Sequence, residues 1–145
     1  MKVIGLDGRQ YRLDLAGRIA SSTDTRPRSA GHLAARKLLV ETYPLDAVYE
    51  EVLLPGFESG SLYADFLLPG PRLMVEVQGQ QHRKYVPHFH GSTAGFRRQV
   101  ARDGLKIEFC EANNIVLVHL RDDATEGWAD DIRRAVGRKT AIGIG

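Results

Sequence analysis

The sequence predicts an α/β fold, in which a central mixed β-sheet is flanked by helices and preceded by an N-terminal β-hairpin arm. Three short apolar runs, 47–54, 62–68 and 73–79, are separated by proline and glycine turns and predict a meander of strands. Residues with helical periodicity precede and follow this meander. The almost wholly apolar run 115–120 comes after the second helix, which is the pattern of a central, buried strand.

The N-terminal segment predicts a β-hairpin. Apolar residues alternate on both sides of Asp7-Gly8, a dipeptide that favours a tight turn between strands. Because two strands alone are marginally stable, the hairpin is expected either to pack on the main body or to act as an arm. Residues 16–28 are polar and are predicted as a loose linker. The expected organisation is therefore an arm and linker (1–28), a core domain (29–137) and a flexible, glycine-rich tail (138–145).

Three helices are predicted. Ser29 is expected to cap a helix that runs to about Tyr43, where Pro44 ends it. A second helix is expected over 93–112, and Thr125 is expected to cap the last one. In the second helix one inward stripe is predicted, which includes the acidic residue Asp103; its members are Phe96, Val100, Asp103, Ile107 and Cys110.

The central strand pair carries the most informative residues. If Leu68 pairs with Leu73 across the turn 69–72, Asp65 lies directly opposite Glu76. Two opposed carboxylates repel each other, and charged residues inside apolar strands are rarely buried unless they are paired or bound to metal. We interpret the pair as a site for Mg²⁺ or Mn²⁺, which prefer oxygen ligands. The alternatives are a solvated sheet edge or a carboxylate that pairs with an arginine.

Length and composition restrict the class of protein. The chain has 145 residues, enough for one domain, and 26% of them are charged, which is ordinary for a globular protein. There is neither a long apolar run that would span a membrane nor a secretory signal. The single cysteine, Cys110, excludes an internal disulfide, so a cytoplasmic location is expected.

Charge is distributed unevenly along the chain. Residues 41–82 carry seven acidic side chains and one basic, whereas residues 83–106 carry six basic and one acidic. An acidic centre beside basic segments suits a metal-dependent phosphodiesterase, with carboxylates for metal and cations for phosphates. The basic side chains expected to face DNA are Arg83, Lys84, Arg97, Arg98, Arg102 and Lys106.

The order of helix, three strands, helix and strand, with Asp65 on one strand and Glu76-Val77-Gln78 on the next, resembles the core of PD-(D/E)XK, or restriction-endonuclease-like, nucleases. The continuation to His82, to Arg102-Asp103 and to the strand at 115–120 is similar to the very-short-patch-repair branch. That branch includes the EDxHD homing endonucleases of phages and introns. The resemblance spans roughly residues 29–122.

Two departures from the family pattern stand out. Gln78 occupies the position where lysine is usual, and glutamine supplies no positive charge near the attacking water. The first glutamate of the EDxHD pattern has no single counterpart, and the four candidate positions are His32, Glu41, Glu50 and Glu51.

The resemblance implies a metal-dependent DNA endonuclease of homing, repair or phage DNA processing, acting as a monomer or a homodimer. Asp65 and Glu76, with the Val77 carbonyl, would hold Mg²⁺ or Mn²⁺. Gln78 would position the nucleophilic water and His82 would accept its proton. Asp103 would orient His82 or bind the metal through water.

Other classes of function stay open from the sequence. A non-catalytic DNA-binding module on the same fold would explain the basic segments but not the opposed carboxylates. An interaction domain unrelated to nucleic acid would explain neither. A structural zinc site lacks the usual ligand spacing, although five candidate ligands exist: His82, His88, His90, Cys110 and His119.

Overall fold

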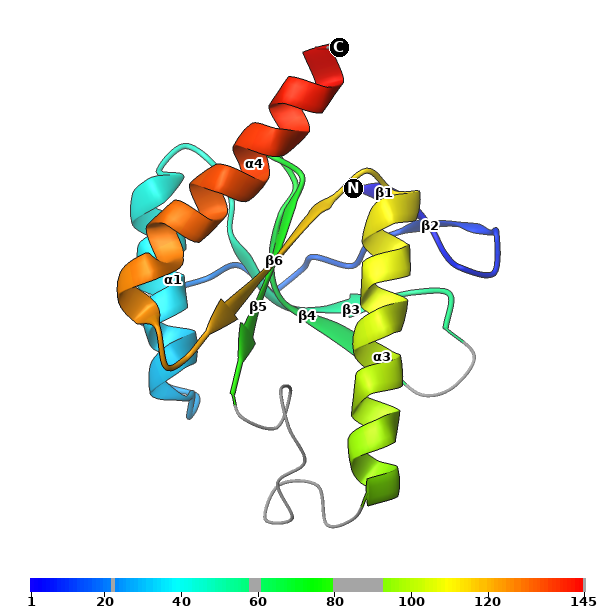
Figure 1. Cartoon of the computed structure of the whole chain (residues 1–145), viewed down its shortest axis with the longest axis horizontal. Helices are drawn as coiled ribbons and strands as arrows, with labels where there is room; N and C mark the ends of the chain where they lie inside the picture. Colours follow the sequence, from blue (N-terminus) through cyan, green and yellow to red (C-terminus); the bar gives the residue numbers. More distant parts are fainter. Residues whose placement is uncertain (22, 58–60, 80–92, 145) are drawn as a thin grey trace.

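The chain folds as an α/β protein with a mixed four-stranded sheet, flanking helices and a separate antiparallel hairpin (Figure 1). The structure, a computed structural model, describes residues 1–21, 23–57, 61–79 and 93–144, with the backbone alone over 139–144. In chain order the elements are β1 (Lys2–Ile4), β2 (Gln10–Arg12), α1 (Ala30–Thr42), β3 (Tyr49–Leu54), β4 (Leu62–Leu68), β5 (Leu73–Gln78), α3 (Thr93–Ala112), β6 (Val116–Arg121), a 3₁₀ turn (Thr125–Gly127) and α4 (Trp128–Ile144).

The sheet has the strand order β3-β4-β5-β6, and it separates two hydrophobic cores. Helices α1 and α4 lie on one face, whereas α3 and the β1–β2 hairpin lie on the other (Figure 1). Phe66, Leu39 and Trp128 are buried on the first face, and Phe109, Met74 and Leu62 on the second. The site described below lies at one end of this sheet, where both layers reach it.

The predicted register of the central hairpin is confirmed. Leu68 pairs with Leu73 and Phe66 with Val75, in an antiparallel arrangement. The parallel pairing of β6 with β5 makes the sheet mixed, as predicted. The prediction that residues 115–120 form a central strand is wrong, because β6 lies at the edge of the sheet. Its apolar residues are covered by helices above and below rather than by strands on both sides.

Along the β3–β4 ribbon, the face that packs against α1 and the face that packs against α3 exchange places at Glu51. Val48 packs on the α1 side of the sheet, whereas Val52 and Leu54 pack on the α3 side. Glu51 between them has a φ of 50°, a left-handed conformation that is rare and strained for a residue other than glycine. The matching change in β4 falls between Ala64 and Phe66, at Asp65. The candidate carboxylate therefore lies where the ribbon changes face.

The N-terminal hairpin packs on the main body. Val3 and Leu13 are buried in the core beneath α3. Asn113, just beyond α3, accepts a hydrogen bond from the Ile4 backbone amide at 2.7 Å and donates one to the Ile4 carbonyl at 2.8 Å. Of the two expectations for this segment, packing on the body is the one that the structure shows.

Helix boundaries follow the sequence closely but not everywhere. The Ser29 cap is confirmed, because its hydroxyl accepts a hydrogen bond from the His32 amide. Thr125 does not cap the last helix and lies instead in the 3₁₀ turn that precedes Trp128. The backbone of α4 continues as helix to residue 144, past residue 138, where we expected a tail.

The predicted inward stripe of α3 is wrong in part. Val100 and Ile107 are exposed, whereas Phe109 and Cys110 are buried. The helix is rotated so that the polar side chain of Lys106 turns inward instead. Among the described residues, no helix has the length and apolar character needed to cross a bilayer.

Two glycines test how the hairpin docks. Gly56 has a φ of 86°, and a Cβ there would lie 2.7 Å from the Gly5 Cα. We expect Gly56→Ala to lower the free energy of unfolding by about 1–3 kcal/mol, because both backbone strain and a backbone clash result. Gly104→Ala on α3 is the control, because a Cβ at this position would meet no atom within 4 Å. This change should raise the free energy of unfolding by about 0.5–1 kcal/mol. Chemical denaturation measures both, and equal effects of the two changes would contradict the close contact.

Candidate functional site

A polar cleft of about 300 Å³ opens at the end of the sheet where β4 and β5 separate. Gly31 lets the first turn of α1 approach this end, since a Cβ there would lie 3.1 Å from Val77 Cγ1. Helix α3 closes the other side. The residues that line the cleft are Ser29, His32, Asp65, Glu76, Val77, Gln78, Asp103 and Lys106.

Asp65 and Glu76 are joined by a reciprocal pair of hydrogen bonds. The Asp65 backbone amide donates to Glu76 Oε2 at 2.9 Å, and the Val77 amide donates to Asp65 Oδ2 at 2.9 Å. Side-chain carboxylates thus accept the hydrogen bonds that main-chain carbonyls accept in a regular ladder. The regular pairing of β4 with β5 ends at Phe66 and Val75, and the strands open beyond it.

Lys106 reaches this pair from α3 and forms an ion pair with Glu76 Oε1. Only 14% of its side chain is exposed. Lys106 was expected to face DNA together with Arg98 and Arg102, and the structure places it inside the cleft. Repulsion between the two carboxylates is therefore relieved in part by a lysine of the chain itself, rather than by a cation alone. Its spacing of three residues from Asp103 was the sequence signal for this position.

Asp65 has an unusual acidity in this environment. Burial, and then the neighbouring charge of Glu76, raise the pKa of Asp65 to about 7. The hydrogen bond from the Val77 amide and the charge of Lys106 act in the opposite direction but are weaker. The raised pKa means that the fold disfavours the ionised form of Asp65, because the surrounding groups do not fully compensate its negative charge.

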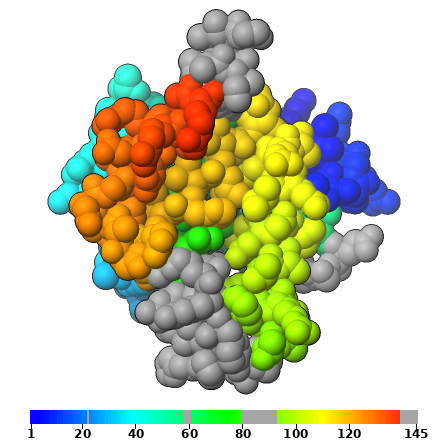
Figure 2. All heavy atoms as spheres, viewed as in Figure 1, coloured from blue at the N-terminus to red at the C-terminus, as the bar shows by residue number. Residues whose placement is uncertain are grey.

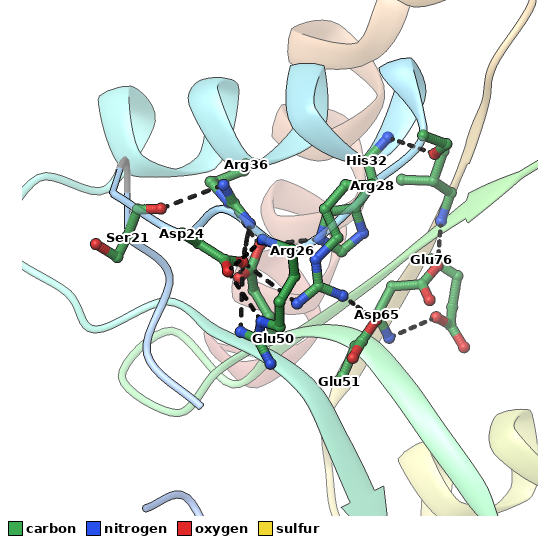
Figure 3. A network of polar contacts seen from close by, with 12 residues as sticks. Ser21, Asp24, Arg26, Arg28, His32, Arg36, Glu50, Glu51, Asp65 and Glu76 are labelled. Carbon is green, nitrogen blue, oxygen red and sulfur yellow. Dashed lines mark hydrogen bonds and ion pairs between the residues drawn. The ribbon is translucent and has the colours of Figure 1, made fainter. Parts of the chain in front are cut away.

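His32 lies on the α1 side of the cleft and is held by a buried carboxylate (Figure 3). Its Nε2 is 2.9 Å from Oε1 of Glu50, and its ring stacks on Phe66. Glu50 also accepts hydrogen bonds from Arg36 at 2.7 and 3.1 Å. Burial alone would raise the pKa of Glu50, but the hydrogen bonds from Arg36 and His32 hold it below its usual value. An ionised carboxylate only accepts, so His32 Nε2 is the donor, and Nδ1 of a neutral ring has a free lone pair.

Residues 16–28 are not the loose linker that we expected. Asp24 lies 3.0 Å from Arg36 and 3.4 Å from Arg28, and Arg28 also pairs with Glu51 (Figure 3). These contacts tie the segment to both α1 and β3. Sequence patterns gave no sign of them, because ion pairs between distant residues leave no local periodicity.

The other predicted site residues fall in three places. Gln78 and Asp103 line the cleft, as expected. Arg97, Arg98 and Arg102 are exposed on α3. His82, Arg83 and Lys84 lie outside the described residues. Of the four candidates for the first glutamate of the EDxHD pattern, only His32 lines the cleft; Glu41 is exposed, and Glu50 and Glu51 are bound by Arg36 and Arg28.

The donor set of the cleft is suitable for a hard divalent cation. Asp65 Oδ1 accepts no hydrogen bond within the described part of the chain, and the pair supplies two carboxylates, the number that Mg²⁺ often uses beside water and phosphate. No complete group of three acidic, histidine or cysteine ligands occurs among the described residues. Of the zinc candidates, Cys110 is buried against Met74, and burial raises its pKa to about 12, so the thiol stays protonated.

Comparisons with known proteins give one related segment. The uncharacterized protein 307L of Invertebrate iridescent virus 6 is 42% identical over 60 residues, which are 41% of this chain and 30% of the viral protein. The chain thus spans less than a third of the length of this relative. No family model matches the chain, and no solved structure matches it. The viral protein's name states no activity.

The raised pKa of Asp65 predicts how stability depends on pH. The folded state binds this proton more tightly than the unfolded chain does, so the contribution of Asp65 to stability falls as pH rises from about 4 to about 7. Asp65→Asn keeps an oxygen for the Val77 amide and removes the charge. In EDTA at pH 8 we expect it to raise the free energy of unfolding by on the order of 2 kcal/mol, with little difference from wild type near pH 4.

Denaturant unfolding at several pH values measures this difference. The exposed carboxylate of Glu41 on α1 provides the control, and Glu41→Gln should leave the pH profile almost unchanged. An Asp65→Asn protein that is less stable than wild type at pH 8 would contradict the arrangement described for the carboxylate pair.

Proposed function

We propose that the protein is a metal-dependent DNA endonuclease that hydrolyses phosphodiester bonds. The observation that carries the proposal is the carboxylate pair of Asp65 and Glu76 on neighbouring strands, inside a cleft that also holds a lysine. Its support is the resemblance of the strand order and motif spacing to restriction-endonuclease-like nucleases. The raised pKa of Asp65 adds a physical reason for a cation to bind there.

Lys106 provides the positive charge that Gln78 cannot. In the family pattern a lysine two residues after the glutamate lies beside the attacking water, and here that position is Gln78. Lys106 comes from the opposite element, α3, yet its amino group reaches the same carboxylate. We assign Lys106 to stabilising negative charge on the phosphate, and Gln78 to orienting the water.

His32 is a second candidate for proton transfer beside His82. Its Nε2 donates to Glu50, which leaves the other ring nitrogen to accept a proton. Glu50 and Arg36 hold the ring in place, in the way that a buried carboxylate positions a catalytic imidazole. His82 lies beyond β5, outside the described residues, and stays the prediction of the sequence.

Asp65 and Glu76 would hold the divalent cation, with the Val77 carbonyl as a further oxygen ligand. When bound, such an ion polarises the phosphoryl oxygen and makes a bound water more acidic. Both carboxylates have to be ionised to hold it, so its affinity should increase as pH rises through about 7. Asp103, which lines the α3 side of the cleft, would bind water or orient a neighbouring side chain.

One observation favours a second function, a DNA-binding module without catalysis. The ion pair between Lys106 and Glu76 already neutralises one of the two carboxylates without any metal. A protein that had lost catalysis would keep such an internal pair and use the exposed arginines of α3 for phosphate contacts. The two functions differ in whether cleavage accompanies binding.

Cleavage of supercoiled plasmid DNA tests the proposal. Wild-type protein should nick or linearise the plasmid with Mg²⁺ or Mn²⁺ and not with EDTA, and Asp65→Ala should be inactive while binding DNA at least as tightly, because one negative charge has left the cleft. Mn²⁺ should also raise the melting temperature of wild type but not of Asp65→Asn. Equal nicking by wild type and Asp65→Ala would overturn the proposal, whereas binding without cleavage by wild type would favour the non-catalytic module.

Substitution of Lys106 distinguishes a role in catalysis from a role in DNA binding. Lys106→Gln should reduce the cleavage rate by about 10²–10³-fold, because a charge aimed at the reacting phosphate is lost. Arg98→Gln, an exposed change on the same helix, should weaken DNA binding slightly and leave the rate at saturating DNA unchanged. Single-turnover kinetics distinguish the two effects. A Lys106→Gln protein with an unchanged rate would show that the lysine only balances Glu76.

A further inference from the structure

A second hollow of about 410 Å³ lies between β6 and α4, outside the carboxylate cleft. Its walls carry three arginines, Arg121, Arg134 and Arg138, against one acidic residue, Asp131. Figure 2 shows this face of the molecule, with β6 in the centre between α4 on one side and α3 on the other. We call this hollow the β6–α4 groove.

The spacing of residues along α4 explains why Arg134 and Arg138 both line the groove. Trp128 and Ile132 are buried against the sheet and fix the orientation of the helix. Residues 131, 134 and 138 then share one flank, because they are three and four residues apart. Arg133 lies outside the groove lining and pairs with Asp130 instead.

The charges of the groove are available to a ligand. Arg134 pairs with Asp131 at 2.7 Å and Arg121 with Asp123 at 3.1 Å, but all four side chains are well exposed, and such surface pairs are weak. Arg138 forms no ion pair within the described residues. A guanidinium binds a phosphate with two parallel hydrogen bonds and exchanges an exposed carboxylate for it at little cost.

The groove and the carboxylate cleft meet the same paired ends of β5 and β6. Arg121 pairs in register with Gln78, which lines the cleft, and the Asp122 amide donates to the Gln78 carbonyl at 3.0 Å. β6 is the edge strand, so no other described strand covers its outer side. A linear polyanion that crosses the cleft at the end of β5 therefore meets Arg121 first, and Arg134 and Arg138 further along α4.

We propose that the β6–α4 groove binds the sugar-phosphate backbone of DNA next to the bond that lies in the cleft. The identity of the ligand as DNA rests on the proposed function, but phosphate binding in the groove does not depend on catalysis. The sequence showed no such surface, because residues 107–145 carry more acidic than basic side chains. Only in the folded chain do three of the arginines line one hollow with a single acidic residue.

Binding of a fluorescently labelled DNA duplex to the full chain in EDTA tests the groove. Arg134→Gln combined with Arg138→Gln should weaken binding about 5–20-fold at moderate salt and reduce the slope of log affinity against log salt by about 1–2. Arg133→Gln is the matched control, an exposed arginine on the same helix outside the groove, and should bind like wild type. Arg121→Gln provides an independent loss of binding from the strand side.

The outcomes separate this proposal from the proposed function. If no protein cleaves DNA but the groove variants still bind it more weakly than the Arg133→Gln control, the endonuclease proposal fails and the groove stands. If the double variant binds as wild type does, or if Arg133→Gln loses as much affinity, the groove proposal is overturned. It is also overturned if wild type binds anionic lipid vesicles through these arginines and does not bind DNA. Thermal denaturation of each variant checks that folding is intact.

Discussion

Two hydrogen bonds between backbone amides and side-chain carboxylates lie where strands β4 and β5 separate to form the cleft. The amides of Asp65 and Val77 donate to the side chains of Glu76 and Asp65, so neither of these two amides is left unpaired although the strands separate. The same two carboxylates that hold the opening also concentrate negative charge in it. Structure and chemistry of the cleft are therefore set by one interaction, and neither carboxylate can be exchanged for an apolar residue without changing both.

Charged side chains around Asp65 and Glu76 reduce the electrostatic cost of burying these two carboxylates. Lys106 approaches from the α3 layer, and His32 approaches from the α1 layer with Glu50 and Arg36 behind it. Buried ions cost desolvation energy unless each has a partner of good geometry. Glu50, Asp24 and Glu76 each have a cationic partner, whereas no ion pair within the described residues involves Asp65. The raised pKa of Asp65 is the remaining imbalance, and it is located at the residue where the ribbon turns over.

The sequence predicted the order of elements and the opposed carboxylates, because alternation along β4 and β5 and the turn between them are local signals. It did not predict the edge position of β6, since an apolar strand reads alike whether strands or helices cover it. The inward position of Asp103 was predicted, but that of Lys106 was missed, because Val100 and Ile107 look like core residues and yet are exposed. The ionic contacts of Asp24, Arg36 and Glu50 join segments far apart in sequence, and no pattern within one segment reveals them.

The Asn113 contact with Ile4 has a consequence for the order of folding. It joins residues 109 positions apart, and the Gly5–Gly56 approach spans about half of that distance in the chain. During synthesis from the N-terminus, the first hairpin emerges long before its docking partners and has to wait for α3 to leave the ribosome. Closing such a long loop is slow, so the hairpin is expected to dock in a late step. Once docked, the hairpin contacts both Asn113 after α3 and Gly56 after β3, so amide exchange at Ile4 should report the undocking of the hairpin from both rather than local fraying.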